Sequence, residues 1–100
     1  MKIIYVTINN PKEARAIGRE ILEKKLANCV NFFPITCIYN YKDEITEEPE
    51  TVLIIKTKEG YYKKIVEVIK SHIDYDNFIG EINVENINDD FSLWLANVVK

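Results

Sequence analysis

The chain has 100 residues, of which 47% are hydrophobic and 29% charged, and its formal net charge is −3. This fits one globular domain, residues 1–100, with a modest core. The acidic balance argues against nucleic-acid partners, and no apolar run approaches the roughly 18 residues that a membrane span needs. The sequence opens without the pattern of a signal peptide, so we expect a cytoplasmic protein with no nucleic-acid and no membrane partner.

The first elements predicted are a strand and a helix. Ile3 to Ile8 is a nearly continuous apolar run, which favours a strand in the interior of a sheet. Asn10 is a suitable N-cap, Pro11 suits the first helical position, and Glu13 completes an asparagine form of the capping box. The helix that follows has an apolar stripe at three- and four-residue steps, formed by Ala14, Ile17, Gly18, Ile21, Leu22 and Leu26.

A long hairpin is predicted over residues 28–57. Two runs rich in β-branched and aromatic residues, 28–41 and 51–57, flank a charged turn over 42–50. The first run far exceeds the usual strand length of about 5–6 residues, so the hairpin should project beyond its domain with exposed apolar side chains. Such a surface promotes aggregation unless a partner covers it, and another copy of the chain is the simplest partner.

The second half of the chain predicts a helix over 61–72, a weaker strand over 78–84 and a short last helix. The apolar stripe of that last helix comprises Phe91, Trp94, Leu95 and Val98. The complete order predicts an α+β fold, a ferredoxin-like βαββαβ sandwich with a long central hairpin and an extra C-terminal helix. Right-handed crossovers place both long helices on one face of an antiparallel sheet, and the other face then needs cover from self-association.

Two cysteines, Cys29 and Cys37, lie in the first strand of the hairpin. Eight residues of extended chain span roughly 26 Å at about 3.3 Å per residue, which is too far for a disulfide. In a cytoplasmic protein we therefore expect two reduced thiols.

Several blocks of the sequence together resemble the CutA divalent-ion tolerance family, over nearly the whole chain. They are Leu26-Ala27-Asn28-Cys29-Val30-Asn31 with Pro34, then Tyr39, Tyr41, Ile45 and Ile55-Lys56-Thr57, and finally His72, Asp90-Phe91 and Trp94-Leu95. The resemblance implies a ferredoxin-like subunit in a compact homotrimer similar to that of the PII signalling proteins, with hairpins wrapped around neighbouring subunits. It also implies a role in tolerance of copper and other divalent metals.

The sequence departs from the family pattern in one loop and at the hairpin tip. Where the family usually has a His-Pro-Tyr step, this chain has His72-Ile73-Asp74 with Tyr75 one position late, and Asn77 replaces an expected proline. Tyr41 stands for the family's hairpin tryptophan and Asp43 for its turn glycine. These changes affect a cleft built by the His-Pro-Tyr loop, whereas the predicted fold is unaffected.

The candidate metal ligands are Cys29 and His72. Cys29 matches the family segment, and thiolates select soft metals such as Cu(I), but a free cysteine in a strand is often a small buried hydrophobe. His72 is the only histidine and ends a predicted helix, where it either binds metal or packs as a structural residue. Copper or another divalent metal is the cofactor we consider, and no organic cofactor is expected.

A second candidate site is an inter-subunit cleft that contains Lys56, Tyr39, Tyr41 and Trp94. Lys56 interrupts an apolar strand, so its ammonium group needs solvent, an acid or an anionic ligand. The alternative is structural: Lys56 forms an interface ion pair with Glu81 or Asp43, and the aromatic residues pack between subunits.

The function predicted is a non-enzymatic, homotrimeric CutA-like protein that binds or senses divalent metal, copper in particular. Neither a nucleophile elbow nor a glycine-rich phosphate loop is present, so no catalysis is expected. The alternative is a PII-like signalling or interaction module that binds a small anionic ligand or a protein at inter-subunit clefts, for which Lys56 matters more than Cys29. A third reading is a structural assembly without a ligand.

Overall fold

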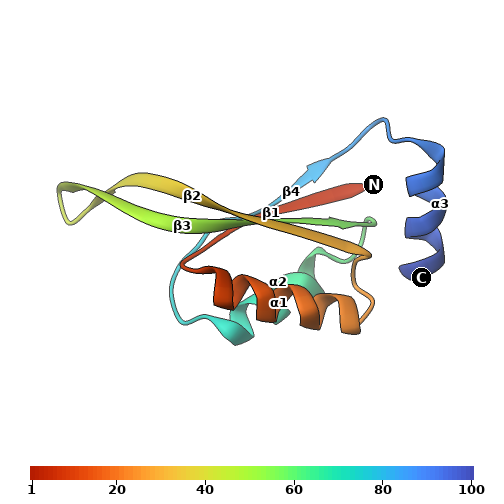
Figure 1. Cartoon of the computed structure of the whole chain (residues 1–100), viewed down its shortest axis with the longest axis horizontal. Coiled ribbons are helices and arrows are strands. Elements are labelled where there is room, and N and C mark those ends of the chain that lie inside the picture. The colour runs from red at the N-terminus through yellow and green to blue at the C-terminus, as the bar shows by residue number, and fades with distance from the viewer.

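The computed structural model describes all 100 residues and has one antiparallel sheet and three helices. In chain order the elements are β1 (Lys2–Ile8), α1 (Pro11–Glu23), β2 (Cys29–Tyr41), β3 (Glu44–Thr57), α2 (Tyr62–His72), β4 (Ile79–Asn83) and α3 (Asp89–Val98). The strand order is β2-β3-β1-β4, and α1 and α2 cover one face of the sheet (Figure 1). The predicted ferredoxin-like α+β fold is therefore confirmed.

Helix α1 begins as the sequence predicts. Oδ1 of Asn10 accepts a hydrogen bond from the backbone N–H of Glu13 at 2.9 Å, and Nδ2 of Asn10 lies 3.3 Å from Oε1 of Glu13. Pro11 occupies the first turn, where a missing N–H costs nothing. The Asn10 cap thus fixes the start of α1, although the Glu13 carboxylate bonds the side-chain amide of Asn10 and not the Asn10 backbone N–H of a full capping box.

The hydrophobic core lies between the sheet and the two helices α1 and α2. Strand β1 pairs with β3 on one side and β4 on the other, so it is an interior strand as expected. Its alternate residues point into the core, and the whole cluster comprises Ile4, Val6, Ile8, Ala14, Ile17, Ile21, Leu26, Ala27, Leu53, Ile55, Ile65, Val68 and Ile69. No comparable layer covers the opposite face of the sheet in one chain (Figure 1).

The turn of the hairpin is much shorter than predicted. Only Lys42 and Asp43 form it, both with positive φ (50° and 66°), as a two-residue hairpin turn requires. The predicted turn over 42–50 is wrong because residues 44–50 belong to β3 and pair with β2. Pro49 is tolerated there since this part of β3 pairs with β2 alone and needs no second row of N–H donors.

The outer half of the hairpin forms a projecting two-stranded arm, residues 35–50. Strand β1 pairs only with residues Thr51 to Thr57 of β3, so the arm extends beyond the body (Figure 1). The molecule measures 47 × 27 × 20 Å along its principal axes. Ile38 is 64% exposed and Ile45 80% exposed, which confirms the predicted projection of apolar side chains.

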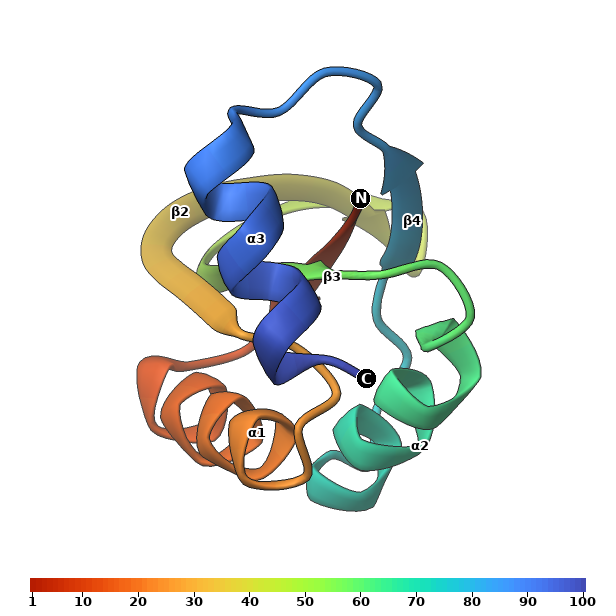
Figure 2. The same cartoon turned by 90° about the vertical axis from the view of Figure 1, so that its right-hand side faces the viewer.

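Helix α3 lies across the end of the sheet opposite to the arm (Figures 1 and 2). Leu95 and the following Val99 are buried, while Leu93 is 67% and Trp94 50% exposed. The predicted stripe of α3 is therefore only partly buried within the chain. No helix of the structure is both long and apolar enough to span a membrane.

Candidate functional site

Cys29 and Lys56 lie side by side on the face of the sheet that α1 and α2 leave open. They are direct partners in the β2–β3 register. Val30 and Ile55, the next residue pair, pack on the helix side, so the alternation of side chains directs Cys29 and Lys56 to the other side. The Cys29 thiol is half-buried, and its Sγ lies 3.9 Å from Oδ1 of Asn31.

Lys56 lies between this open face and α3. Its Nζ is 5.5 Å from the centre of the Phe91 ring, a cation–π contact. Lys56 and Phe91 line a hollow of about 140 Å³ together with Met1, Ile87 and Asn88. The lysines that form ion pairs within the chain are Lys2 and Lys24, so Lys56 has no carboxylate partner within one chain.

Tyr39 and Tyr41 lie on the arm, far along β2 from Cys29. They line a cavity of about 530 Å³ where the arm leaves the body, together with Asn9, Asn40, Glu48, Glu50, Tyr75 and Asp76. Partial burial, followed by a hydrogen bond to Glu48, raises the pKa of Tyr39. Partial burial and the nearby Glu50 likewise raise the pKa of Cys37.

The four residues predicted to share a cleft do not share one within a single chain. Lys56 lines the hollow beside α3, whereas Tyr39 and Tyr41 line the cavity at the arm. Trp94 lines neither and packs edge-on against Phe91, with 5.5 Å between ring centres. A cleft that unites all four requires a second subunit and remains a prediction.

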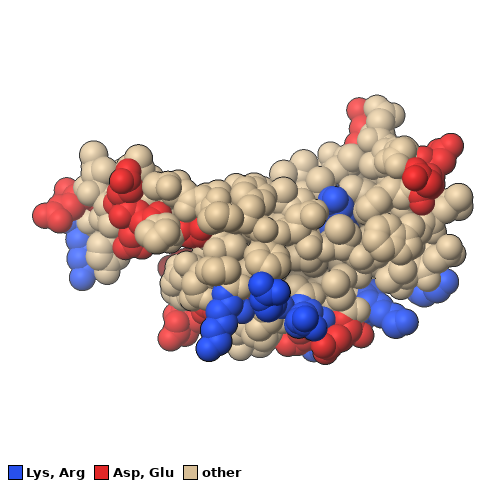
Figure 3. All heavy atoms as spheres, viewed as in Figure 1, with Lys and Arg blue, Asp and Glu red and all other residues tan.

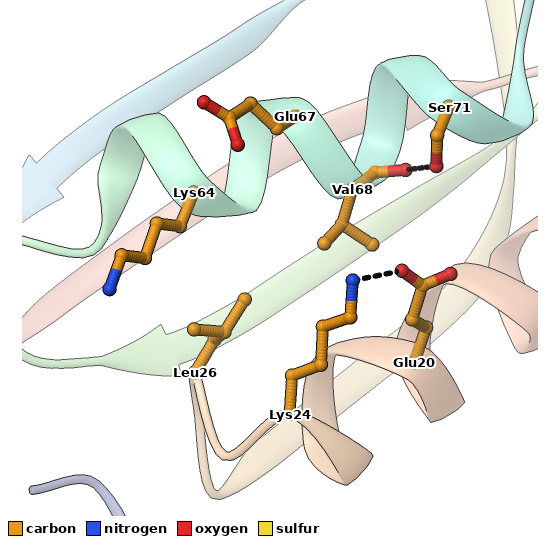
Figure 4. Close-up of a pocket in the computed structure, with 7 residues that line it drawn as sticks. All are labelled: Glu20, Lys24, Leu26, Lys64, Glu67, Val68 and Ser71. Atoms are coloured by element: carbon orange, nitrogen blue, oxygen red, sulfur yellow. Dashed lines mark hydrogen bonds and ion pairs between the residues drawn. The ribbon is translucent and has the colours of Figure 1, made fainter.

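His72 connects the end of α2 to α1. Its Nε2 lies 2.8 Å from Oε1 of Glu20, whose Oε2 is 2.8 Å from Nζ of Lys24. The hydrogen bonds from Lys24 and then His72 hold the pKa of Glu20 below its usual value. Figure 4 shows Glu20 and Lys24 beside a cavity of about 390 Å³ between the two helices, which Leu26, Lys64, Glu67, Val68 and Ser71 also line.

The two candidate metal ligands therefore lie in different layers of the molecule. His72 belongs to the helix layer and is engaged with Glu20, whereas Cys29 is on the open face of the sheet opposite an ammonium group. No group of three or more His, Cys, Asp or Glu side chains is arranged to hold a metal ion. The donors of one chain do not fit a metal centre by themselves.

Two residues of the altered loop after α2 have a structural role that the sequence did not indicate. The Tyr75 hydroxyl accepts a hydrogen bond from the Asn9 backbone N–H at 2.9 Å and donates one to Oε1 of Glu13 at 2.7 Å. Burial, followed by the bond to Glu13, raises the pKa of Tyr75 to about 12. Nδ2 of Asn77 donates to the carbonyl oxygen of Thr7 at 2.9 Å, which ties the loop to β1.

A four-stranded ferredoxin-like sheet with a projecting two-stranded arm and a third helix across its far end defines the structural class of this subunit. Residues 2–98 match the family described as CutA1 divalent ion tolerance protein. The chain belongs to the CutA family.

Curated relatives and solved structures give the same result. The chain is 35% identical over 100 residues to the divalent-cation tolerance protein CutA of Thermotoga maritima, with 99% of each chain covered. The structure of CutA from Archaeoglobus fulgidus, titled a periplasmic divalent cation tolerance protein, has a TM-score of 0.94 and 31% identity and covers 100% of both chains. CutA1 from Pyrococcus horikoshii has a TM-score of 0.92 and 28% identity, with 100% of this chain and 99% of that chain covered.

Proposed function

We propose that this protein acts in tolerance of divalent metal ions as a cytoplasmic homotrimer that binds copper or a similar metal and catalyses no reaction. Membership of the CutA family, over residues 2–98, supports the role in metal tolerance and is the observation that carries the proposal. The Thermotoga maritima relative bears the name divalent-cation tolerance protein.

The exposed apolar surface of the chain supports assembly. Large apolar side chains are exposed on the arm, on the open face of the sheet and on α3, and they include Phe33, Ile38, Ile45, Phe78, Ile82, Leu93 and Trp94. Monomeric proteins rarely expose that many in extended patches, because burying them between subunits is favourable. The arm also leaves its own strand edges without pairing partners, which neighbouring subunits can cover.

Metal binding by this protein needs donors from more than one subunit. One chain has no cluster of three donors, and Cys29 is its family-matched thiol. Threefold symmetry repeats that thiol in each subunit, and thiolates favour Cu(I) over hard cations.

Anaerobic titration of the assembled protein with Cu(I) against a competing chelator tests this proposal. We expect Cys29→Ser to reduce the Cu(I) affinity at least about tenfold through loss of a thiolate ligand. Cys37→Ser is the matched control and should bind like the unsubstituted protein. Equal Cu(I) affinity in a Cys29→Ser/His72→Ala double variant would remove the proposed metal site.

The cytoplasmic location is a separate part of this proposal. The Archaeoglobus fulgidus relative, by contrast, is titled periplasmic. Cell fractionation decides between the two locations: recovery with periplasmic markers would contradict this part of the proposal.

The half-buried Lys56 favours a second candidate function, a PII-like module that binds a small anion or a protein between subunits. Its ammonium group has no ion-pair partner in the chain and borders the hollow at Phe91. In that case Lys56→Met should abolish ligand binding and leave Cu(I) affinity unchanged, whereas Cys29→Ser should do the opposite. Calorimetric titration with inorganic phosphate and with Cu(I) separates the two functions.

A further inference from the structure

A groove between α1 and the start of β2 lies apart from all the sites described above. It has a volume of about 280 Å³ and is lined by Arg15, Gly18, Arg19, Leu22, Val30 and Phe32. None of these residues belongs to the Cys29–Lys56 face, the arm cavity or the His72–Glu20 contact. The groove combines two cations with an apolar floor, and each part restricts what can bind there.

The cationic wall consists of Arg15 and Arg19, which are one helical turn apart on α1. Both are exposed, and neither takes part in an ion pair within the chain. Cζ of Arg15 lies 5.4 Å from the centre of the Phe32 ring, and this cation–π contact positions its guanidinium group over the groove. Positively charged side chains gather over α1 on the face shown in Figure 3.

The floor of the groove is apolar and partly open to solvent. Leu22 and Phe32 are large hydrophobic residues whose side chains are exposed. Val30 is half-buried and packs against the core. Gly18 is buried and contributes no side chain, and a Cβ at this position would lie 3.4 Å from Cγ1 of Val30. The absence of a side chain at Gly18 therefore keeps the groove open at its base.

We propose that this groove binds a small amphipathic carboxylate. A planar guanidinium group matches the geometry of a carboxylate, which it binds through paired charge-assisted hydrogen bonds, and two such groups line this groove. The apolar body of the ligand then covers Leu22, Val30 and Phe32. The volume lies just below the usual range of ligand pockets, about 300–1,000 Å³, and this limits the body to a short chain or a single ring.

Titration of the isotope-labelled full chain with octanoate, followed by amide chemical shifts, tests the proposal. We expect saturable shifts confined to α1 and the first residues of β2. Octanamide, which lacks the charge, and acetate, which lacks the apolar body, should each bind at least about tenfold more weakly, since each loses one of the two kinds of contact. Equal binding of octanamide and octanoate would overturn the assignment of the arginines.

Matched variants separate this site from general electrostatic attraction. Arg15→Gln/Arg19→Gln should weaken octanoate binding at least about tenfold. Lys12→Gln/Lys63→Gln removes the same charge from exposed helical positions outside the groove and should leave the affinity within about twofold. Gly18→Ala keeps both arginines but fills the base of the groove, so it should also weaken binding. The amide spectrum of each variant shows whether it is folded. Unchanged octanoate affinity in both the arginine and the glycine variants would overturn the proposal.

Discussion

At the scale of single residues, the positions that organise the loop after α2 are those at which the sequence departs from the family pattern. Tyr75 connects this loop to Asn9 and Glu13, and Asn77 connects it to Thr7. The same loop forms one wall of the cavity at the base of the arm. The hydrogen bonds of Tyr75 and Asn77 therefore fix this loop in place of the prolines that the family pattern has there.

Because the pKa of the Tyr75 hydroxyl is raised in the folded chain, we expect the free energy of unfolding to fall at alkaline pH. Its folded pKa of about 12 lies above the usual value of 10.0, so folding favours the neutral phenol. This contribution is complete below pH 10 and is lost as the pH rises from 10 towards 12. Tyr75→Phe should lower the free energy of unfolding by about 1 kcal/mol at pH 7, through loss of a hydrogen-bonded hydroxyl.

Urea unfolding of both proteins between pH 7 and 12 checks this prediction. The stability difference between the two proteins should shrink above pH 10, because the unsubstituted protein loses its contribution from Tyr75 while the variant has none to lose. A stability difference that stays constant up to pH 12 would contradict the role assigned to Tyr75.

At the scale of secondary-structure elements, local signals in the sequence were sufficient for most of the fold. The Asn10 cap, the apolar stripe of α1 and the apolar run of β1 depend on neighbours within a few residues, so pattern and capping rules identify them. The outer half of β3 was missed because its glutamates and Pro49 favour a loop locally. Pairing with β2 overrides that preference.

The contacts at the candidate sites were also harder to predict, because they join residues that are far apart in the sequence. His72 and Glu20 are 52 residues apart, and Tyr75 and Glu13 are 62 residues apart. Spacing along the sequence carries no information about such pairs. The sequence did identify Cys29 and Lys56 individually, whereas their direct pairing depends on the register of the hairpin.

The two-residue turn at the tip of the arm predicts a stabilising substitution. Asp43 has a φ of 66°, a left-handed conformation that glycine adopts without steric cost. Asp43→Gly should raise the free energy of unfolding by up to about 1 kcal/mol. Glycine at Glu44, which is within β3, is the control and should be destabilising. Thermal and urea unfolding measure the stability of both variants. Equal destabilisation of the two would contradict the turn assignment.

At the scale of the whole molecule, the features that the single chain leaves incomplete are the arm, the open face of the sheet and the outer side of α3. Each carries large exposed apolar side chains, and in our proposal a second subunit completes both the metal site and the Lys56 cleft. The groove at Arg15 and Arg19 is the one proposed site that invokes no residue of a second subunit.

The most direct test of the account is the molecular mass of the protein in solution, measured by light scattering with and without copper on the same sample. We predict three times the chain mass of 11.7 kDa in both conditions, with copper binding to an assembly that already exists. A species of 11.7 kDa in both conditions would contradict the account, because the exposed arm and the inter-subunit sites would then have no partner.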